Sequence, residues 1–316
     1  MPERPTIETI REAARRIAPW VHRTPVATSA TLDRELGARI FFKCENRQKV
    51  GAFKARGAVN TVLSLDAAAA AKGVITHSSG NHAAALAYAA RIRGIPCTVV
   101  MPEQAPSIKV EAVRGYDADV VFCERGEREK VCDRLIRERG QTFVHPYAEP
   151  RVIAGQGTAA LELLEEVADL DVVVAPVGGG GLLTGTAIAA RALRPSAAIR
   201  GAEPEAVDDA YRSLTTGVRQ PAVDDPRTLA DGLLTGLGEI NFSILRELGV
   251  EIVTVTESSI VQAARFILER MKLVVEPSAA TALAAIRRCA GELHGKRVGA
   301  ILSGGNTDFS WLQGSP

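Results

Sequence analysis

The sequence has 316 residues, of which 46% are hydrophobic and 24% charged, proportions typical of a globular protein with a core large enough for about two domains. Its 38 basic and 37 acidic residues give a formal net charge of +1 without any basic block, which excludes an electrostatic nucleic-acid partner and favours a small molecule. No apolar run reaches the about 18 residues of a membrane span, and residues 1–20 do not form a secretion signal, so we expect a cytoplasmic protein without a membrane partner.

The first half of the chain alternates between helix-like and strand-like segments. Thr6 is placed to cap a helix over residues 7–17, and residues 39–45 (RIFFKCE) form a strand-like run. From Gly73 onward, apolar runs are separated by Ala-, Arg- and Glu-rich stretches, for example the helix expected over residues 81–93. The predicted strands of this region are GVITHSS, CTVVMP and ADVVFCE. This rhythm is typical of βαβ units.

The same alternation returns in the second half, after a connecting stretch over residues 141–157. Helices are expected over residues 258–270 and 277–288, and the predicted strands are DVVVAPV, AIRGAEP, EIVTVTE and RVGAILSGG. Strands this continuously apolar are covered on both faces, as in parallel sheets between layers of helices. We therefore predict an α/β fold with two such units.

Lys54 lies in the stretch VGAFKARGA, between Phe53 and small residues. A lysine that must lose its proton and attack a carbonyl needs an apolar neighbour and a fixed stem. The alternative is a surface lysine without a chemical role.

The stretch PVGGGGLLTG, residues 176–185, carries four glycines between an apolar strand and a helix. Their N–H groups can surround an anion, and the helix N-terminus adds about half a positive charge. A tight turn alone needs one or two glycines, so a phosphate site is favoured. No Gly-Lys-Ser/Thr follows, so this is not a P-loop. GQGTAA, residues 155–160, matches a dinucleotide fingerprint formally, but it lacks a preceding strand and is predicted to pack closely at a helix start.

Two further turns carry hydrogen-bonding side chains where a strand meets a helix. In THSSGNHAAALA, the candidates to cradle a carboxylate are Ser78, Ser79, Gly80, Asn81 and His82. A plain helix cap with a neighbouring histidine is the alternative. In LSGGN, Ser303 faces either a ring nitrogen or a helix end that it caps.

These turns predict one site at the carboxyl edge of a sheet. Serine-hydrolase and zinc-enzyme patterns are missing from the sequence, which has neither G-x-S-x-G nor H-E-x-x-H. The five cysteines never form C-x-x-C, which argues against a disulfide framework or a zinc knuckle and favours buried thiols.

The motifs together resemble the fold type II pyridoxal-phosphate enzymes, in particular the serine/threonine dehydratase and serine racemase family. Six motifs occur in the family's order: GAFKARGA, SSGNHAAALA, HPYAEPRVIAGQGT, VGGGGLLTG, MKLVVEPSAA and LSGGN. The resemblance implies two open, twisted, mainly parallel sheets flanked by helices, as in the tryptophan synthase β-like fold. It also implies a large domain of residues 1–65 and 150–316, a small domain of residues 66–149 inserted in it, an active site between them, and a homodimer.

The resemblance also implies roles for individual residues. Lys54 would hold pyridoxal phosphate covalently and move the α-proton, and Ser79 would face the other side of the substrate. The other cofactor contacts implied are Phe53, Asn81, Gly178, Gly179, Gly180, Gly181, Gly232, Glu276 and Ser303. The substrate contacts implied are Ser78, Ser79, Gly80, His82 and Arg128, of which Arg128 has a solvated helix face as its alternative. A cation site for Mg²⁺, Ca²⁺ or Mn²⁺ is implied at Glu203, Val207 and Asp209, with a solvated acidic loop as its alternative.

The activity implied is dehydration of a β-hydroxy amino acid, namely L-serine, L-threonine or 3-hydroxyaspartate, to a 2-oxo acid and ammonia. Racemisation of serine or an aspartate-type amino acid by Lys54 and Ser79 is the alternative within the same site. A non-catalytic phosphate- or nucleotide-binding α/β protein is the alternative of another class, and it would give Lys54 no task.

Overall fold

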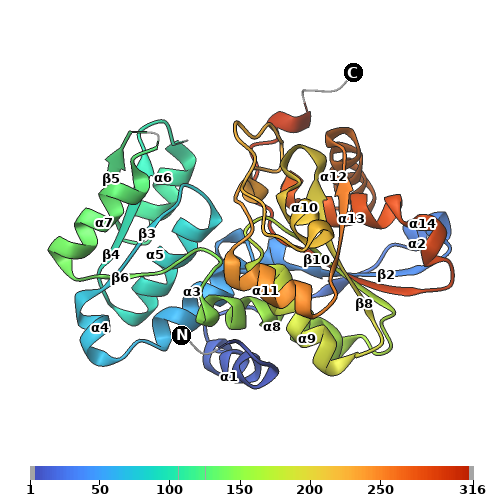
Figure 1. Cartoon of the computed structure of the whole chain (residues 1–316), viewed down its shortest axis with the longest axis horizontal. Helices are drawn as coiled ribbons and strands as arrows, with labels where there is room; N and C mark the ends of the chain where they lie inside the picture. The colour runs from blue at the N-terminus through green and yellow to red at the C-terminus, as the bar shows by residue number, and fades with distance from the viewer. Residues whose placement is uncertain (1–3, 106, 125, 313–316) are drawn as a thin grey trace.

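The computed structural model describes residues 4–105, 107–124 and 126–312, which form two sheets flanked by helices (Figure 1). A six-stranded sheet has the order β1-β2-β10-β7-β8-β9, and a four-stranded sheet has the order β5-β4-β3-β6. Neighbouring strands pair in parallel except β1 with β2. The predicted fold class is therefore confirmed.

The strands agree closely with the apolar runs of the sequence. The larger sheet contains β1 (Val26–Ala27), β2 (Arg39–Cys44), β7 (Val172–Pro176), β8 (Ala198–Pro204), β9 (Glu251–Val255) and β10 (Arg297–Leu302). The smaller sheet contains β3 (Val74–His77), β4 (Cys97–Pro102), β5 (Asp119–Cys123) and β6 (Thr142–Phe143). The smaller sheet lies between β2 and β7 in the chain, as an inserted domain would, and the predicted domain limits at 65/66 and 149/150 stay a prediction.

Helices follow most strands. The first seven are α1 (Ile7–Ile17), α2 (Ala30–Leu36), α3 (Lys54–Leu63), α4 (Ala67–Lys72), α5 (Asn81–Arg93), α6 (Ser107–Arg114) and α7 (Arg128–Arg139). The others are α8 (Pro150–Glu166), α9 (Gly181–Leu193), α10 (Asp209–Thr216), α11 (Glu239–Glu247), α12 (Glu257–Met271), α13 (Pro277–Arg288) and α14 (Ala290–Leu293). Thr6 caps α1 as predicted, because its hydroxyl accepts the N–H of Thr9.

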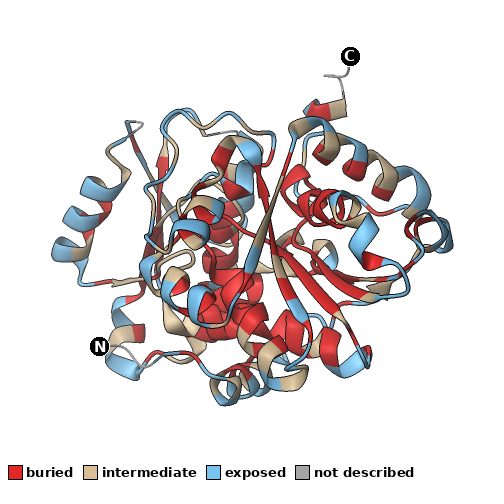
Figure 2. Ribbon diagram, turned by 45° about the vertical axis from the view of Figure 1, so that its right-hand side comes forward, coloured by how far each residue is buried: buried red, intermediate tan, exposed pale blue. Residues whose placement is uncertain are grey.

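Both faces of the larger sheet are buried, as the continuous apolar strands predicted (Figure 2). Successive residues of β7 point to opposite faces. Val172 and Val174 pack into a core with α12 and α13, whereas Val173 and Ala175 pack into a core with α1, α8 and α9. This period of two explains why the strand carries no polar face.

Helix α8 contacts α3 and α9 through glycines. A Cβ on Gly155 would lie 2.6 Å from the Cα of Gly57, and a Cβ on Gly185 would lie 2.6 Å from the backbone nitrogen of Gly157. The predicted close packing of residues 155–160 is correct, but its placement at a helix start is wrong. These residues lie inside α8, because Pro150 begins the helix five residues earlier.

Four charged side chains, of which Glu162 is partly exposed, connect α3 to the larger sheet and to α8. Arg56 donates to both carboxylate oxygens of Glu45, at 2.7 and 2.8 Å, and of Glu162, at 2.7 and 2.9 Å. The ammonium of Lys43 lies 2.8 Å from Glu162. Arg56, Lys43 and Glu45 are completely buried. Two cations and two anions balance, which is the condition under which buried charges are tolerated.

Two other expectations concern cysteines and membranes. All five cysteines are free thiols, and four of them are buried, as predicted. Among the helices of the described residues, none combines the length and the apolar character needed to cross a bilayer.

We expect the substitution Arg56→Ala to lower the free energy of unfolding by about 3–5 kcal/mol, because it leaves the buried Glu45 carboxylate without a cation. The matched control is Arg287→Ala, which breaks the 2.9 Å pair with the more exposed Glu35 and should cost less than about 1 kcal/mol. Urea unfolding followed by circular dichroism measures both. Equal losses in the two variants would contradict a special role of the buried network.

Candidate active site

Lys54 is the first residue of α3 and lies where the two sheets meet. The backbone N–H of the preceding Phe53 donates to the carbonyl of Ser303 at 3.0 Å, which fixes the helix start to the end of β10. The Lys54 amine donates to the carbonyl of Pro146 at 2.8 Å and lies 5.2 Å from the centre of the Phe53 ring. The amine is thus held by the segment that follows β6.

The environment of Lys54 favours its neutral form. Burial lowers the pKa of the amine to about 8, and the nearby carboxylate of Glu276 opposes this shift. An ordinary lysine has a pKa of about 10.4 and is almost fully charged at neutral pH. Lys54 therefore supplies far more neutral amine, the form that attacks a carbonyl or accepts a proton.

The four glycines form the turn between β7 and α9, and all four are buried. Backbone or ring atoms occupy the space that side chains would need. A Cβ on Gly178 would lie 2.9 Å from the Cα of Leu233, and a Cβ on Gly179 would lie 2.2 Å from the ring of Tyr147. Gly180 has a φ of +93°, in the region that favours glycine.

The amide groups of this turn are available to a ligand. Within the described ranges, the N–H groups of Gly178, Gly179 and Gly180 have no hydrogen-bond acceptor. Buried N–H groups are rarely left unpaired. They lie at the N-terminus of α9, a helix of 13 residues, where the helix dipole favours an anion. The turn therefore fits a phosphate group.

Asn81 joins the two halves of the molecule beside Lys54. Its amide nitrogen lies 3.0 and 3.1 Å from the two carboxylate oxygens of Glu276, and its amide oxygen accepts from Asn306 at 2.9 Å. Burial raises the pKa of Glu276 to about 7, although the hydrogen bond from Asn81 opposes the shift. Glu276 is therefore a second group that titrates near neutral pH.

Ser303 and Gly232 flank the same region. Ser303 is buried, and in the described part of the chain its hydroxyl makes no hydrogen bond, so it is available to a ring nitrogen. Gly232 is exposed, and its N–H donates to the hydroxyl of Ser278 at 2.9 Å. A Cβ on Gly232 would lie 3.9 Å from Glu276.

The predicted substrate loop follows β3. Ser78, Ser79 and Gly80 are half-buried just before α5, and the hydroxyl of Ser78 accepts the N–H of Gly80 at 3.3 Å. The Nε2–H of His82 donates to the carbonyl of Val144 at 3.1 Å, whereas its buried Nδ1 has no partner among the described residues. Burial lowers the pKa of His82 to about 3, so this ring is neutral.

Sequence reasoning missed a row of rings beside Lys54. Phe143, His145 and Tyr147 are two residues apart along the chain, and neighbouring ring centres lie 5.9 and 4.5 Å apart. The Nδ1 of His145 accepts the N–H groups of Tyr147 and Ala148, so its Nε2 carries the hydrogen. Burial lowers the pKa of His145 to about 4. The only sequence signal was the motif HPYAEP, which gave these rings no individual role.

Arg128 is not among the residues that contact Lys54 in the described part of the chain. It begins α7 and is half-buried, and within the described residues its guanidinium makes no hydrogen bond or ion pair. Its charge acts on His77, at the end of β3, where burial and this charge lower the pKa of the imidazole. Arg128 therefore lies near His77, on the part of the molecule built on the smaller sheet.

The predicted cation ligands lie apart from the amine, at the end of β8. Both oxygens of the buried Glu203 carboxylate accept backbone N–H groups, from Ala210 at 2.9 Å and from Tyr211 at 2.8 Å. Asp209 accepts the N–H of Leu237 at 2.7 Å, and Val207 is buried beside them. The described residues contain no cluster of three or more His, Cys, Asp and Glu side chains that could hold a metal ion.

The site as a whole fits pyridoxal phosphate. The neutral amine of Lys54 suits the aldehyde, the unpaired glycine N–H groups suit the phosphate, and the Ser303 hydroxyl suits the ring nitrogen. All three groups follow strands of the larger sheet, namely β2, β7 and β10, whose carboxyl ends lie at the same edge.

Comparisons with known proteins agree with this chemistry. Residues 17–304 match the family model described as pyridoxal-phosphate dependent enzyme. A β-hydroxyaspartate dehydratase of Paracoccus denitrificans is 49% identical over 310 residues, which cover 98% of this chain and 98% of that protein. A serine racemase of Dictyostelium discoideum is 47% identical over 310 residues, which cover 96% of each chain. The crystal structure of a T.th. threonine deaminase matches with a TM-score of 0.91 at 47% identity, covering 97% of this chain and 100% of that one.

The lowered pKa of Lys54 predicts an unusual pH dependence of its reactivity. In the cofactor-free protein, reductive methylation of Lys54 should be half-maximal near pH 8, because the neutral amine forms as the pH rises through its pKa. Exposed lysines should become reactive only near their ordinary value of about 10.4. Peptide mass spectrometry resolves Lys54 from the other lysines.

The control variant for this experiment is Glu276→Gln. Loss of a nearby negative charge disfavours the ammonium form, so the midpoint for Lys54 should move below that of the unchanged protein. A midpoint near the ordinary lysine value of about 10.4 in the unchanged protein would contradict the proposed environment of the amine.

Proposed function

The chain belongs to the family of pyridoxal-phosphate dependent enzymes, and we propose that it is an ammonia-lyase that dehydrates a β-hydroxy amino acid to a 2-oxo acid and ammonia. The observation that carries the proposal is the half-buried Lys54, whose amine has a pKa of about 8, together with the unpaired N–H groups of the glycine turn. The full-length similarity to a protein named β-hydroxyaspartate dehydratase supports it. A protein that only binds phosphate or a nucleotide would not need such an amine.

Among the candidate substrates L-serine, L-threonine and 3-hydroxyaspartate, we favour 3-hydroxyaspartate. This substrate carries a second carboxylate, and a guanidinium binds a carboxylate through two parallel hydrogen bonds. Arg128 is half-buried and makes no hydrogen bond or ion pair within the described residues. Two further similar proteins, from Saccharomyces cerevisiae and a Pseudomonas species, are named L-threo-3-hydroxyaspartate ammonia-lyase.

The protein's groups divide the work around the reacting carbon. When bound, pyridoxal phosphate withdraws electrons from Cα of the amino acid, which makes the α-proton removable. Lys54 would hold the aldehyde, and once the substrate has released its amine it would accept this proton, because burial favours the neutral amine. The glycine N–H groups would hold the phosphate, Ser303 would contact the ring nitrogen, and Asn81 would contact the phenolic oxygen. Phe53, Gly232 and Glu276 would complete the cofactor contacts.

The loop of Ser78, Ser79 and Gly80, with His82 behind it, is assigned to the substrate carboxylate. It precedes α5, a helix of 13 residues whose N-terminus favours an anion. Ser79 makes no hydrogen bond within the described part of the chain, so its hydroxyl is available to return a proton to Cα. This second role would make the protein a serine or aspartate-type racemase, and the 47% identity to a protein named serine racemase favours that alternative.

We expect Lys54→Ala to abolish both the release of 2-oxo acid from 3-hydroxyaspartate and any inversion of L-serine, because both need the amine. Ser79→Ala should reduce inversion at least about tenfold and dehydration much less, since only inversion needs a proton from the opposite face. Coupled 2-oxo acid reduction and chiral chromatography measure the two reactions. Turnover that survives in Lys54→Ala would refute the proposed function.

We also propose a divalent cation, Mg²⁺, Ca²⁺ or Mn²⁺, at Glu203, Asp209 and the carbonyl of Val207. Carboxylate and carbonyl oxygens are suitable ligands for these ions. Both carboxylates are buried, and burial raises the pKa of Glu203 to about 8, a cost that a bound cation would offset. The homodimer implied by the family resemblance and the cytoplasmic location expected from the sequence stay predictions.

The cation site predicts a change in thermal stability. At a pH of about 8.5, a saturating cation should raise the melting temperature, because a ligand at about 100 times its Kd stabilises by about 2.7 kcal/mol. Glu203→Gln should remove the shift. Glu205→Gln is the matched control, since Glu205 lies nearby but is exposed and paired with Arg288 at 2.9 Å. An unchanged shift in Glu203→Gln would rule out this site.

A further inference from the structure

A short ion pair joins the half of the molecule built on the smaller sheet to the half built on the larger sheet. Lys109, on α6 beside the smaller sheet, places its ammonium 2.7 Å from the carboxylate of Asp231. Asp231 belongs to the half built on the larger sheet, 122 residues farther along the chain. Both side chains are partly exposed, at 35% for Lys109 and 49% for Asp231, so the pair lies at the edge of the site and not inside it.

Asp231 begins a short turn that contacts the cofactor region on two sides. The turn covers Asp231–Leu233. The N–H of Gly232 donates to Ser278, two residues after Glu276, at 2.9 Å. The backbone of Leu233 packs against Gly178, where a Cβ would lie 2.9 Å from the Leu233 Cα. A displacement of Asp231 would therefore disturb both the segment that carries Glu276 and the glycine turn at Gly178.

The pair is close enough to Glu276 for both of its charges to be felt there. Burial is the main cause of the raised pKa of Glu276, and beyond the hydrogen bond from Asn81, Asp231 raises this pKa further while Lys109 lowers it. The only side-chain hydrogen bonds of Lys109 and Asp231 in the described residues are the ones they make to each other. Lys109 thus has one evident task, which is to bind the turn of the opposite half.

We propose that Lys109 and Asp231 are a positioning pair that holds the two halves closed over the amino-acid substrate and keeps the Gly232 turn in place. Within the described residues neither side chain makes a hydrogen bond to Lys54, and the pair is expected to govern substrate affinity and to leave the chemical step unchanged. The kinetic part of this inference rests on the proposed function. The structural part, the closure itself, does not.

The expected effects follow from the exposure of the pair. An ion pair at the surface changes an equilibrium by a factor of about 1.5 to 5, and salt screens it because the Debye length falls from about 10 Å at 0.1 M to about 3 Å at 1 M. Reversal of one charge replaces attraction with repulsion. We therefore expect Lys109→Glu and Asp231→Lys each to raise KM about five- to tenfold, with kcat changed less than about twofold.

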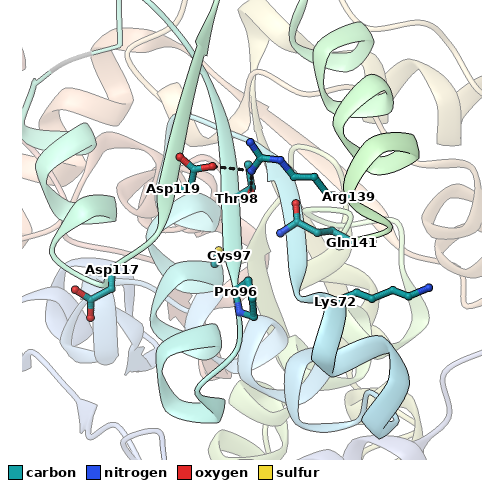
Figure 3. A pocket seen from close by; sticks show the side chains of 8 residues that line it. All are labelled: Lys72, Pro96, Cys97, Thr98, Asp117, Asp119, Arg139 and Gln141. Carbon is teal, nitrogen blue, oxygen red and sulfur yellow. Dashed lines mark hydrogen bonds and ion pairs between the residues drawn. The ribbon is translucent and has the colours of Figure 1, made fainter.

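The experiment combines the two single variants with the double variant Lys109→Glu/Asp231→Lys, which restores an ion pair of opposite polarity. The matched control is the pair of Arg139 and Asp119, at 2.6 Å with exposures of 41% and 54%. This pair lines a groove of about 340 Å³ at the amino ends of the strands of the smaller sheet. The candidate site lies at the opposite, carboxyl ends of the strands. In the groove the side chains of Arg139 and Asp119 point toward each other (Figure 3). Asp119→Lys should leave KM unchanged.

Hydrogen exchange of the holoenzyme gives a readout that does not need turnover. Residues 229–234 should exchange about five times faster in each single variant than in the unchanged protein, and at the unchanged rate in the double variant and in Asp119→Lys. If exchange behaves this way while no 2-oxo acid is formed, the positioning pair stands and the proposed reaction fails.

Either of two results at low salt would overturn the positioning pair itself. One is a double variant whose exchange and KM are as disturbed as the two single variants combined, because restored attraction would then have no effect. The other is Lys109→Glu with the KM and exchange of the unchanged protein. Loss of the KM difference between Lys109→Glu and the unchanged protein at about 1 M salt would support the proposal, and persistence of the full difference would contradict it.

Discussion

The position of the Lys54 backbone depends on a network of four charged side chains, three of which are completely buried. Arg56 lies two residues after Lys54, and it is bound on one side by Glu45, which follows β2, and on the other by Glu162 in α8. Removing such charges from water costs several kcal/mol per ion, so the arrangement is stable only when each donor and acceptor is satisfied. The requirement for complete pairing leaves α3 a single position relative to β2 and α8. The backbone of Lys54 is fixed as a consequence.

Close backbone contacts extend this constraint from the amine to the glycine turn. Helix α3 begins with Lys54 and packs on α8 through Gly57 and Gly155, while α9 begins with Gly181 and packs on α8 through Gly157 and Gly185. Side chains at these contacts would push the helices apart. Because both helices lie directly on α8, the separation between the amine and the unpaired N–H groups is set by backbone geometry. A ligand that carries an aldehyde and a phosphate group on neighbouring positions of one ring needs such a fixed separation.

The sequence predicted the parts of the molecule that depend on local pattern. Continuous apolar runs predicted eight of the ten strands, and the motifs around Lys54 and Gly178 pointed to the segments that meet at the site. The two-residue strands β1 and β6 were not predicted. They are strands because they pair with β2 and β3, and their own two residues form no recognisable apolar run. The ion pair of Lys109 and Asp231 was not predicted for the same reason, because the local sequence around either residue does not identify a partner in the other half.

The protonation states of the site show how closure and chemistry are connected. Burial keeps His82 and His145 neutral, with pKa values of about 3 and 4. Of these four groups of the site, Lys54 and Glu276 are therefore the two that titrate closer to neutral pH. A phosphate and a substrate carboxylate add negative charge, which favours the ammonium form of Lys54. Burial opposes this effect, because it disfavours the charged form of the amine. The contacts that join the halves, from Asn81 in the interior to Lys109 at the rim, therefore help to keep the amine in its reactive form.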